Sequence, residues 1–391
     1  MKVLILTVQK SPSFGACLQT FALYKYICGL GHDCQVMDLA LPIHPDFVYT
    51  RGFPMMLREP VSPWSQLKTY IRHPRTLLRH WRNIIKNGVD YKELQLISKC
   101  KVAPLDDSKE NFDRFESLIR YTKRYRSIKE LYANPPEADV YVTGSDQCWN
   151  PTQPWSLEPF FLTFVRKGKK MTYATSIGTS CITKFAERKF AKWLKGFYRL
   201  SLREQTGVSI IQKLTNINVN KCCDPTFLIP QGDWMDLAGN RQVKESYVYV
   251  FMLYDNKTVI DRCQKFARNT NRKLIVQDHA YSKWHNCNYP FNTSAGPIEF
   301  INLIRYADLV VTDSFHGSAF SLMMNTPFRT LISNASRSTR ILELLNDARA
   351  KQCLLESSEA IQIRNIDFME VQQAISLQAS SGKKYLQQCL L

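Results

Sequence analysis

Short apolar runs, small-residue turns and helical patterns alternate in both halves of this chain. The first example has an apolar run at 3–8, a Ser/Pro/Gly turn at 11–15, a helical pattern closed by glycines at 29–31, and a second apolar run at 34–39. A strand, helix and strand in this order predict a parallel sheet that binds ligands near the carboxyl ends of its strands.

The second half repeats the alternation, with apolar strand-like runs at 246–253, 273–278 and 308–313 separated by helical patterns. A chain of 391 residues, 45% of them hydrophobic, can bury two cores of ordinary size. We therefore expect two doubly wound, Rossmann-like α/β domains facing a cleft, at 1–200 and 201–391, with a basic helical insert at about 58–132 in the first.

The net charge of +18 predicts an anionic partner, such as a phosphorylated substrate or an anionic membrane surface. No nucleic-acid module accompanies the charge, so nucleic acid is not expected. Six cations and no acid lie between Pro60 and Val89, among apolar residues at helical spacing: Lys68, Arg72, Arg75, Arg79, Arg82 and Lys86. This stretch predicts a basic amphipathic helix, which either packs on its own domain or docks on a membrane surface.

The twelve cysteines include no CxxC pair, and no apolar run is long enough for a signal peptide or a membrane span. We expect reduced thiols in a cytoplasmic protein, with the inner face of the membrane as a candidate location. His279, His285 and Cys287 are close in sequence, but their spacing matches no common zinc site, so no metal site is predicted.

The run at 308–319 is the most informative for chemistry. A buried strand there delivers Asp313, Ser314 and His316 to a sheet edge, and a helix starts at once. The amides of Gly317 and Ser318 at that helix start could bind an anion, and His316 could donate to a phosphate or act as a general acid. The alternative is structural: Ser314 caps the helix, and His316 fills a polar corner.

A second strand ends in the polar turn of ADVYVTGSDQCWNP, at residues 138–151. Asp146 there is either a base or a turn residue that bonds its own backbone. The residues of this turn that suit a sugar are Gly144, Ser145, Gln147, Trp149 and Asn150. An indole can stack on a pyranose while amides bind hydroxyls, although Trp149 could equally belong to the core.

Five stretches of the chain, in this order, resemble the polysaccharide pyruvyl transferase family: SFGACLQTFALYKYICGLGH, VTGSDQCWNP, MTYATSIGTS, SLREQTGVSIIQKL with CCDPTFLIP, and TDSFHGSAFSLMMNTPF. Together they span roughly residues 3–345, and their shared order makes the resemblance more specific than any one motif. His316 and Arg203 align with the family's positions. Ser314 and Phe315 differ from the Arg-Leu of the Arg-Leu-His-Gly turn in some members, and Ser13 replaces a common asparagine.

The resemblance implies a fold like the GT-B form of many glycosyltransferases and transfer of pyruvate from phosphoenolpyruvate to a sugar, often in a lipid-linked precursor. It implies no metal or organic cofactor. Phosphoenolpyruvate needs cationic or amide donors at two places, which Arg203, Arg340 and the helix start after Ser314 could supply. Ser13 and Gly15 belong to the first turn of the site, and Asp146 or Asp313 is the candidate base. Arg203 could instead form a structural ion pair.

The first domain would then hold the acceptor and the second the donor. Two other functions stay open at this point. A nucleotide-sugar glycosyltransferase could use the same helix start for a diphosphate. A non-catalytic partner of a membrane-bound assembly complex would use only the basic surface. The sequence gives no indication of the oligomeric state or of the acceptor sugar.

Overall fold

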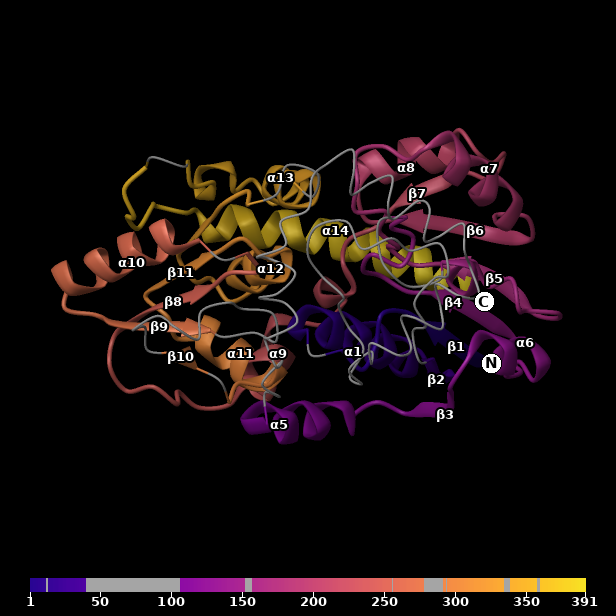
Figure 1. Ribbon diagram of the computed structural model, residues 1–391, viewed down its shortest axis with the longest axis horizontal. Coiled ribbons are helices and arrows are strands. Elements are labelled where there is room, and N and C mark those ends of the chain that lie inside the picture. The colour runs from indigo at the N-terminus through magenta and orange to yellow at the C-terminus, as the bar shows by residue number, and fades with distance from the viewer. Residues whose placement is uncertain are drawn as a thin grey trace, which may run out of the picture.

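The protein consists of two parallel α/β units joined side by side (Figure 1). The computed structural model describes residues 1–11, 13–39, 106–151, 157–254, 256–277, 291–292, 294–333, 338–356 and 359–391. The predicted basic helix at 60–89 lies outside these ranges. Each sheet is parallel throughout, which confirms the predicted fold class of two doubly wound α/β units.

The first sheet has seven strands in the order β3-β2-β1-β4-β5-β6-β7. Its strands are β1 (Lys2–Leu6), β2 (Asp33–Leu39), β3 (Tyr121–Tyr125), β4 (Val140–Thr143), β5 (Lys169–Thr172), β6 (Phe197–Leu202) and β7 (Val219–Lys221). The strand order reverses between β1 and β4, which pair directly with each other. Ligands bind at such a reversal point in open α/β sheets, so the loops after β1 and β4 are well placed for a site.

The second sheet has five strands in the order β10-β9-β8-β11-β12. These are β8 (Tyr247–Phe251), β9 (Lys273–Gln277), β10 (Phe291–Asn292), β11 (Leu309–Thr312) and β12 (Phe328–Thr330). Here the order reverses between β8 and β11. The loop that carries Asp313 and His316 therefore follows a strand at the reversal point.

Helices cover both sheets. Those of the first unit are α1 (Phe14–Gly29), α5 (Asp106–Glu116), α6 (Ile128–Ala133), η1 (Glu158–Phe161), α7 (Lys184–Trp193), α8 (Gln205–Gln212) and η2 (Pro225–Leu228), whereas the following helix, α9 (Gln231–Ala238), packs on helices of the second unit. Those of the second are α10 (Lys257–Asn269), α11 (Pro297–Arg305), α12 (Phe315–Met323), α13 (Ser338–Asp347), η5 (Lys351–Cys353) and α14 (Phe368–Cys389).

Helix α1 joins the two units through an aromatic core. The ring of Phe14 stacks on Phe300 of α11, with centroids 4.7 Å apart, and on Phe112 of α5 at 5.4 Å. Further along α1, Phe21 packs against Trp234. These buried side chains form one hydrophobic cluster that includes residues of both sheets. The first turn of α1 is thereby fixed between the carboxyl ends of the two sheets.

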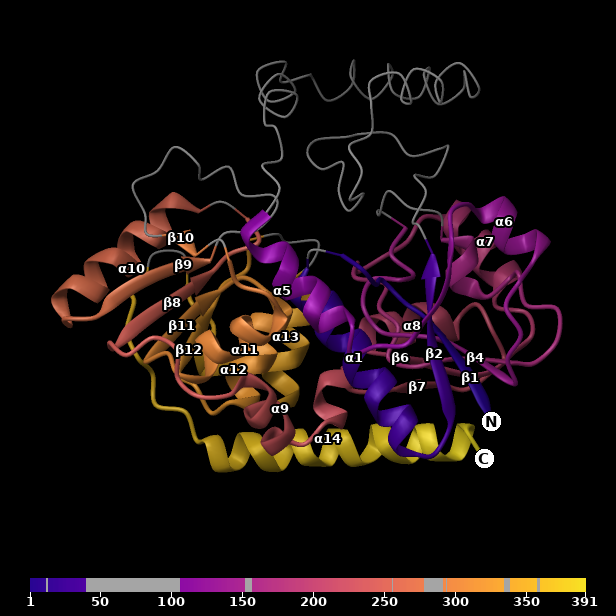
Figure 2. The same ribbon diagram turned by 90° about the horizontal axis from the view of Figure 1, so that it is seen from below.

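Helix α14 ties the end of the chain back to the first unit, running along both units (Figure 2). The hydroxyl of Tyr385 donates to the carbonyl of Thr172 on β5, and Tyr198 on β6 donates to the carbonyl of Cys389. Gly382 lies against the hydroxyl of Tyr173. The two chain termini consequently lie near each other at the outer end of the first unit.

Two sequence predictions differ from the structure. The boundary predicted near residue 200 falls within β6, whereas the first sheet continues to Lys221 and the second starts at Tyr247. A strand's partner is not visible from its own pattern, so β6 and β7 could not be assigned to a sheet from the sequence. The helical pattern expected up to residue 132 is also interrupted by β3, which pairs with β2 at the sheet edge.

Candidate active site

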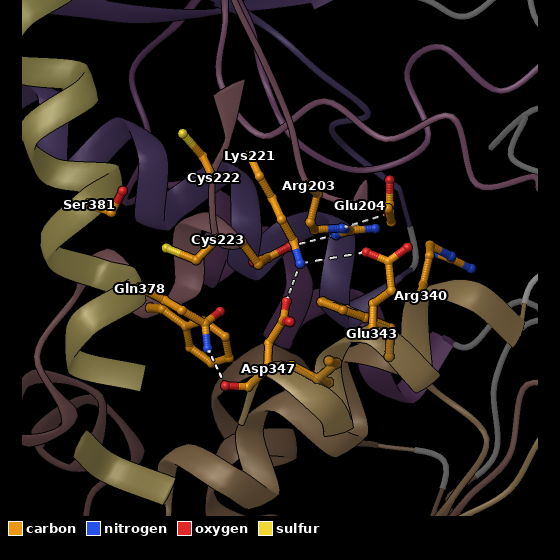
Figure 3. A pocket seen from close by; sticks show the side chains of 14 residues that line it. Arg203, Glu204, Lys221, Cys222, Cys223, Arg340, Glu343, Asp347, Gln378 and Ser381 are labelled. Carbon is orange, nitrogen blue, oxygen red and sulfur yellow. Dashed lines mark hydrogen bonds and ion pairs between the residues drawn. The ribbon is translucent and has the colours of Figure 1, made fainter. Parts of the chain in front are cut away.

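A cavity of about 270 Å³ lies where the two units meet. Its walls come from the ends of β6 and β7, from η2, and from α12, α13 and α14 (Figure 3). Its lining includes three cations and four carboxylates: Arg203, Lys221, Arg340, Glu204, Asp224, Glu343 and Asp347. These seven side chains make the cavity highly charged, which suits a polar, ionised ligand.

Arg203 is the centre of a buried charge cluster. It follows β6, and its side chain is only 3% exposed. Its Nη1 donates to Asp224 Oδ2 at 2.6 Å, and its Nε donates to Glu204 Oε1 at 3.1 Å. Burial disfavours the charged guanidinium, but the carboxylates of Glu204 and Asp224 outweigh it and raise the pKa of Arg203. The arginine is therefore a permanent cation.

Asp224 connects this cluster to His316. It starts η2, where its Oδ1 accepts from the amide and hydroxyl of Thr226, and Ser145 donates to its Oδ2. His316 Nε2 lies 3.5 Å from the same Oδ2. Burial opposes ionisation of Asp224, but His316 and Arg203 outweigh it and hold the pKa of that carboxyl well below its usual range. Asp224 is thus a fixed anion facing the imidazole of His316.

His316 lies in the first turn of α12 and also touches the first turn of α1. A Cβ at Gly15 would lie 2.7 Å from Cε1 of His316 and closer still to Nδ1, so only glycine permits this approach. Ser314 is the N-cap of α12, and its hydroxyl accepts from the amide of Gly317 at 3.3 Å. The structure therefore brings Gly15 and His316 into contact from two units, with Ser314 at the start of the same helix as His316.

The turn after β4 lies beside Arg203. Ser145 receives a long hydrogen bond of 3.5 Å from Nη1 of Arg203, and the charge of Asp146 contributes to the raised pKa of Arg203. Asp146 has a left-handed backbone, with φ of 70°, and its Oδ1 accepts from the amide of Gln147. Asn150 in turn donates to Oε1 of Gln147 at 2.6 Å. Gly144 packs directly against Thr7 on the other side of the sheet reversal.

The comparison with known proteins is decided by one match. The family model of polysaccharide pyruvyl transferases covers residues 14–336, which include Arg203, Asp224 and His316. The chain belongs to the polysaccharide pyruvyl transferase family. No curated protein matches the chain.

Among solved structures, the chain is similar to a UDP-GlcNAc 2-epimerase from Methanocaldococcus jannaschii, at 12% identity and a TM-score of 0.49, over 100% of this chain and 99% of the other. It is also similar to the UDP-GlcNAc 2-epimerase from Neisseria meningitidis, at 9% identity and a TM-score of 0.48, over 100% and 99% of the two chains. The glycosyltransferase SnogD from Streptomyces nogalater matches at 12% identity and a TM-score of 0.41, over 99% of each chain.

Within this pyruvyl transferase family member, three predicted binding residues have structural roles. Trp149 is fully buried, stacks on Phe161 at 4.3 Å and donates to the carbonyl of Phe160. The prediction that it stacks on a sugar is therefore wrong, because a flat ring with no exposed face cannot bind one. The amide of Ser318, predicted to bind an anion, donates instead to the carbonyl of Ser314 at 3.0 Å, and its hydroxyl lies within hydrogen-bond distance of the same carbonyl and of the Thr330 hydroxyl in the core. Asn150 is likewise buried, although its amide bonds Gln147 at the turn.

Asp313 also has a structural role in this structure. Its two carboxylate oxygens accept from the amides of Leu253 and Tyr254, at 2.5 and 3.1 Å, and so fix the loop after β8. Burial raises the pKa of Asp313 to about 6, although these amides partly oppose the shift. Of the two candidate bases, Asp146 is the one whose charge reaches Arg203.

The remaining predicted residues border the site. Gly317 has no room for a side chain, because a Cβ there would lie 2.5 Å from Oγ1 of Thr312. Ser13 is the N-cap of α1, and its carbonyl accepts from the amide of Cys17. Arg340 on α13 lines the cavity. These positions place the first turns of α1 and α12 and one further arginine around the same charged region.

Sequence reasoning missed the acidic half of the cavity and one cation. Lys221, Glu204, Asp224, Glu343 and Asp347 all line it. Asp224 had a local signal, the Asp-Pro turn in CCDPTFLIP, and Glu204 is next to Arg203. Glu343 and Asp347 had none, because they sit on a helix of the other unit and meet Lys221 only in the folded chain.

Neither a metal site nor a membrane span is seen in the described ranges. No group of three or more His, Cys, Asp and Glu side chains there is arranged as metal ligands. His279, His285 and Cys287 lie outside those ranges. None of the helices described is long and apolar enough to cross a membrane.

Proposed function

We propose that this protein transfers pyruvate from phosphoenolpyruvate to two hydroxyls of one sugar, forming a cyclic ketal and releasing phosphate. A proton adds to the methylene carbon, and C2 becomes the electrophile. The first sugar hydroxyl then bonds to C2, and the second displaces phosphate from it. Of the two hydroxyl protons released, one replaces the proton spent on the methylene and the other leaves with the phosphate. The reaction needs no oxidant or reductant.

The observation that carries this proposal is the contact of His316 with Asp224 beside Arg203, within a chain of the pyruvyl transferase family. The carboxylate of Asp224, 3.5 Å from Nε2, favours one orientation of the imidazole. His316 is then suited to give a proton to the methylene carbon or to bond the departing phosphate.

Cations for the two anionic groups of phosphoenolpyruvate come from both units. The guanidinium carbon of Arg203 lies 4.2 Å from the ring centre of Phe315, the residue just before His316. Arg203 thus supplies positive charge beside the turn in which some family members carry an arginine. Arg340 lines the same cavity from α13. We assign the donor to this region, between the end of β6 and the start of α12.

The acceptor would then approach from the turn after β4. Asp146 is half-buried there, and it is our candidate base for the sugar hydroxyls, since Asp313 is engaged by two backbone amides. Ser145 and Gln147 offer polar groups in the same turn. A lipid-linked oligosaccharide at the inner face of the membrane is the acceptor that fits the chain's net charge of +18.

The test is phosphate release from phosphoenolpyruvate by the purified full chain, with and without a panel of aryl and lipid-linked galactosides and mannosides. We expect acceptor-dependent release and a product sugar that carries the mass of a pyruvate ketal. His316→Ala should abolish both, whereas His32→Ala, which changes a histidine in the turn before β2, should not. Release of a nucleotide from a sugar nucleotide, with no reaction of phosphoenolpyruvate, would instead favour a glycosyltransferase.

A further inference from the structure

The start of helix α8 is capped by a carboxylate from the other unit. Oε2 of Glu343 accepts from the amide of Gln205 at 2.6 Å, while Oε1 accepts from the amide of Thr206 at 3.2 Å and from its hydroxyl at 2.7 Å. The helix's own N-cap residue, Glu204, makes no side-chain cap bond. An anion is held here by three donors at a helix N-terminus, which is the arrangement by which proteins bind phosphate and carboxylate groups.

A cation completes this arrangement. Lys221 Nζ lies 3.6 Å from Oε2 of Glu343 and also forms an ion pair with Asp347 one turn further along α13 (Figure 3). Two amides, a hydroxyl and an ammonium group form a donor set that matches an oxyanion with several acceptor oxygens. Glu343 offers this donor set only two oxygens and one negative charge.

A second, independent feature belongs to a residue that lines the same cavity. Nη2 of Arg203 makes no hydrogen bond with any residue of the described ranges, and the arginine side chain is only 3% exposed. A buried guanidinium donor without a partner is costly, and a ligand oxygen would satisfy it. Arg203, Glu343 and Lys221 all line the cavity, so one ligand could reach both places.

We infer that the start of α8, with Thr206 and Lys221, is an oxyanion site that Glu343 fills when no ligand is present, and that an incoming phosphate group displaces Glu343. Glu343 can leave because it belongs to α13 of the second unit and its side chain is 22% exposed. Displacement would break the bonds that join α8 to α13, so ligand entry and separation of these two helices are one event. The assignment of this phosphate to phosphoenolpyruvate rests on the proposed function. The oxyanion site at the start of α8 does not depend on it.

The experiment measures the affinity of the full chain for inorganic phosphate by isothermal titration and by thermal shift, with sulfate as a second probe. Glu343→Gln removes the charged competitor and leaves the side-chain size unchanged. Because a charge-assisted competitor is removed, we expect phosphate to bind roughly tenfold or more tightly to this variant. Adding Thr206→Val to Glu343→Gln should reverse most of that gain, because the hydroxyl donor is lost.

Asp347→Asn is the matched control. It removes the same charge from the same helix and the same partner, Lys221, but Asp347 makes no bond to α8. A smaller gain in Asp347→Asn than in Glu343→Gln shows that occupancy of the helix start, and not the cavity's general charge, limits binding. Equal gains in the two variants, or no gain in Glu343→Gln together with a lower melting temperature, would show that Glu343 only caps α8, and the inference would be refuted.

These outcomes are separable from those for the proposed function. Tighter phosphate binding in Glu343→Gln without any turnover of phosphoenolpyruvate would retain the oxyanion site and reject the reaction. Turnover of phosphoenolpyruvate with phosphate affinities that do not respond to Glu343 or Thr206 would do the reverse.

Discussion

The contact between Gly15 and His316 makes a sharp prediction about catalysis. In Gly15→Ala, the new Cβ would lie 2.7 Å from Cε1 of His316. Carbon atoms in contact are about 3.5–4.0 Å apart, so the ring must move by at least about 1 Å. A displacement of that size in a reacting group costs about a hundredfold in rate. We expect phosphate release from phosphoenolpyruvate to fall by that factor or more.

The same substitution should lower stability by an amount typical of overpacking, about 1–3 kcal/mol. The matched control is Gly29→Ala, at the other end of the same helix, where a Cβ would meet nothing within 4 Å. Alanine is the better helix former by about 1 kcal/mol, so the control should be neutral or slightly stabilised, with full activity. The two variants are compared by thermal melting and by phosphate release. If Gly15→Ala matches Gly29→Ala in both, His316 does not lie against α1 as described.

Three further predictions concern buried groups. Asp224→Asn leaves Arg203 with one carboxylate fewer, so the free energy of unfolding measured in urea should fall by about 3–5 kcal/mol at neutral pH. Because the pKa of Asp224 is lowered in the folded state, the parent loses stability as pH falls below about 4, and the variant should lose less. For Asp313, whose pKa is raised to about 6, stability should decline as pH rises from about 4 to about 6, and Asp313→Asn should flatten that decline in pH-dependent melting curves. Trp149→Ala should cost about 3–5 kcal/mol by cavity formation, while the KM for the acceptor in the surviving folded enzyme stays unchanged; a raised KM would restore a sugar-binding role.

The ends of the strands could be predicted from the sequence because each has a signal in the residues next to it. An apolar run followed by small and polar residues identified the turns of Gly15, Asp146 and His316, and the parallel sheets then brought these turns to facing edges. Arg203 was found through the resemblance of its segment to the pyruvyl transferase family, and it lies just after β6. Its alternative, a structural ion pair, is also present, since Asp224 and Glu204 both bond it.

Other roles depend on contacts that no local pattern encodes. Trp149 follows a polar turn, as a sugar-binding residue could, but its ring is enclosed by Phe161 and Phe197, which come from later segments. The pairing of Lys221 with Glu343 joins strand β7 of the first unit to helix α13 of the second, over more than a hundred residues of chain. Their meeting depends on how the units pack, and that packing is set by α1, α11 and α14 together.

Charge balance in the cavity explains why the site is built from both units. Its three cations, Arg203, Lys221 and Arg340, are matched by four carboxylates in the lining, so a phosphorylated anion entering it adds to an existing negative excess. Asp224 and Glu204 cannot move away without leaving Arg203 buried and unpaired, which is costly. Glu343 can, because it bonds amides that a phosphate would bond equally well. If the inferred oxyanion site takes a phosphorylated donor, withdrawal of the Glu343 carboxylate would lower this negative excess, and donor binding would then be coupled to the contact between α8 and α13.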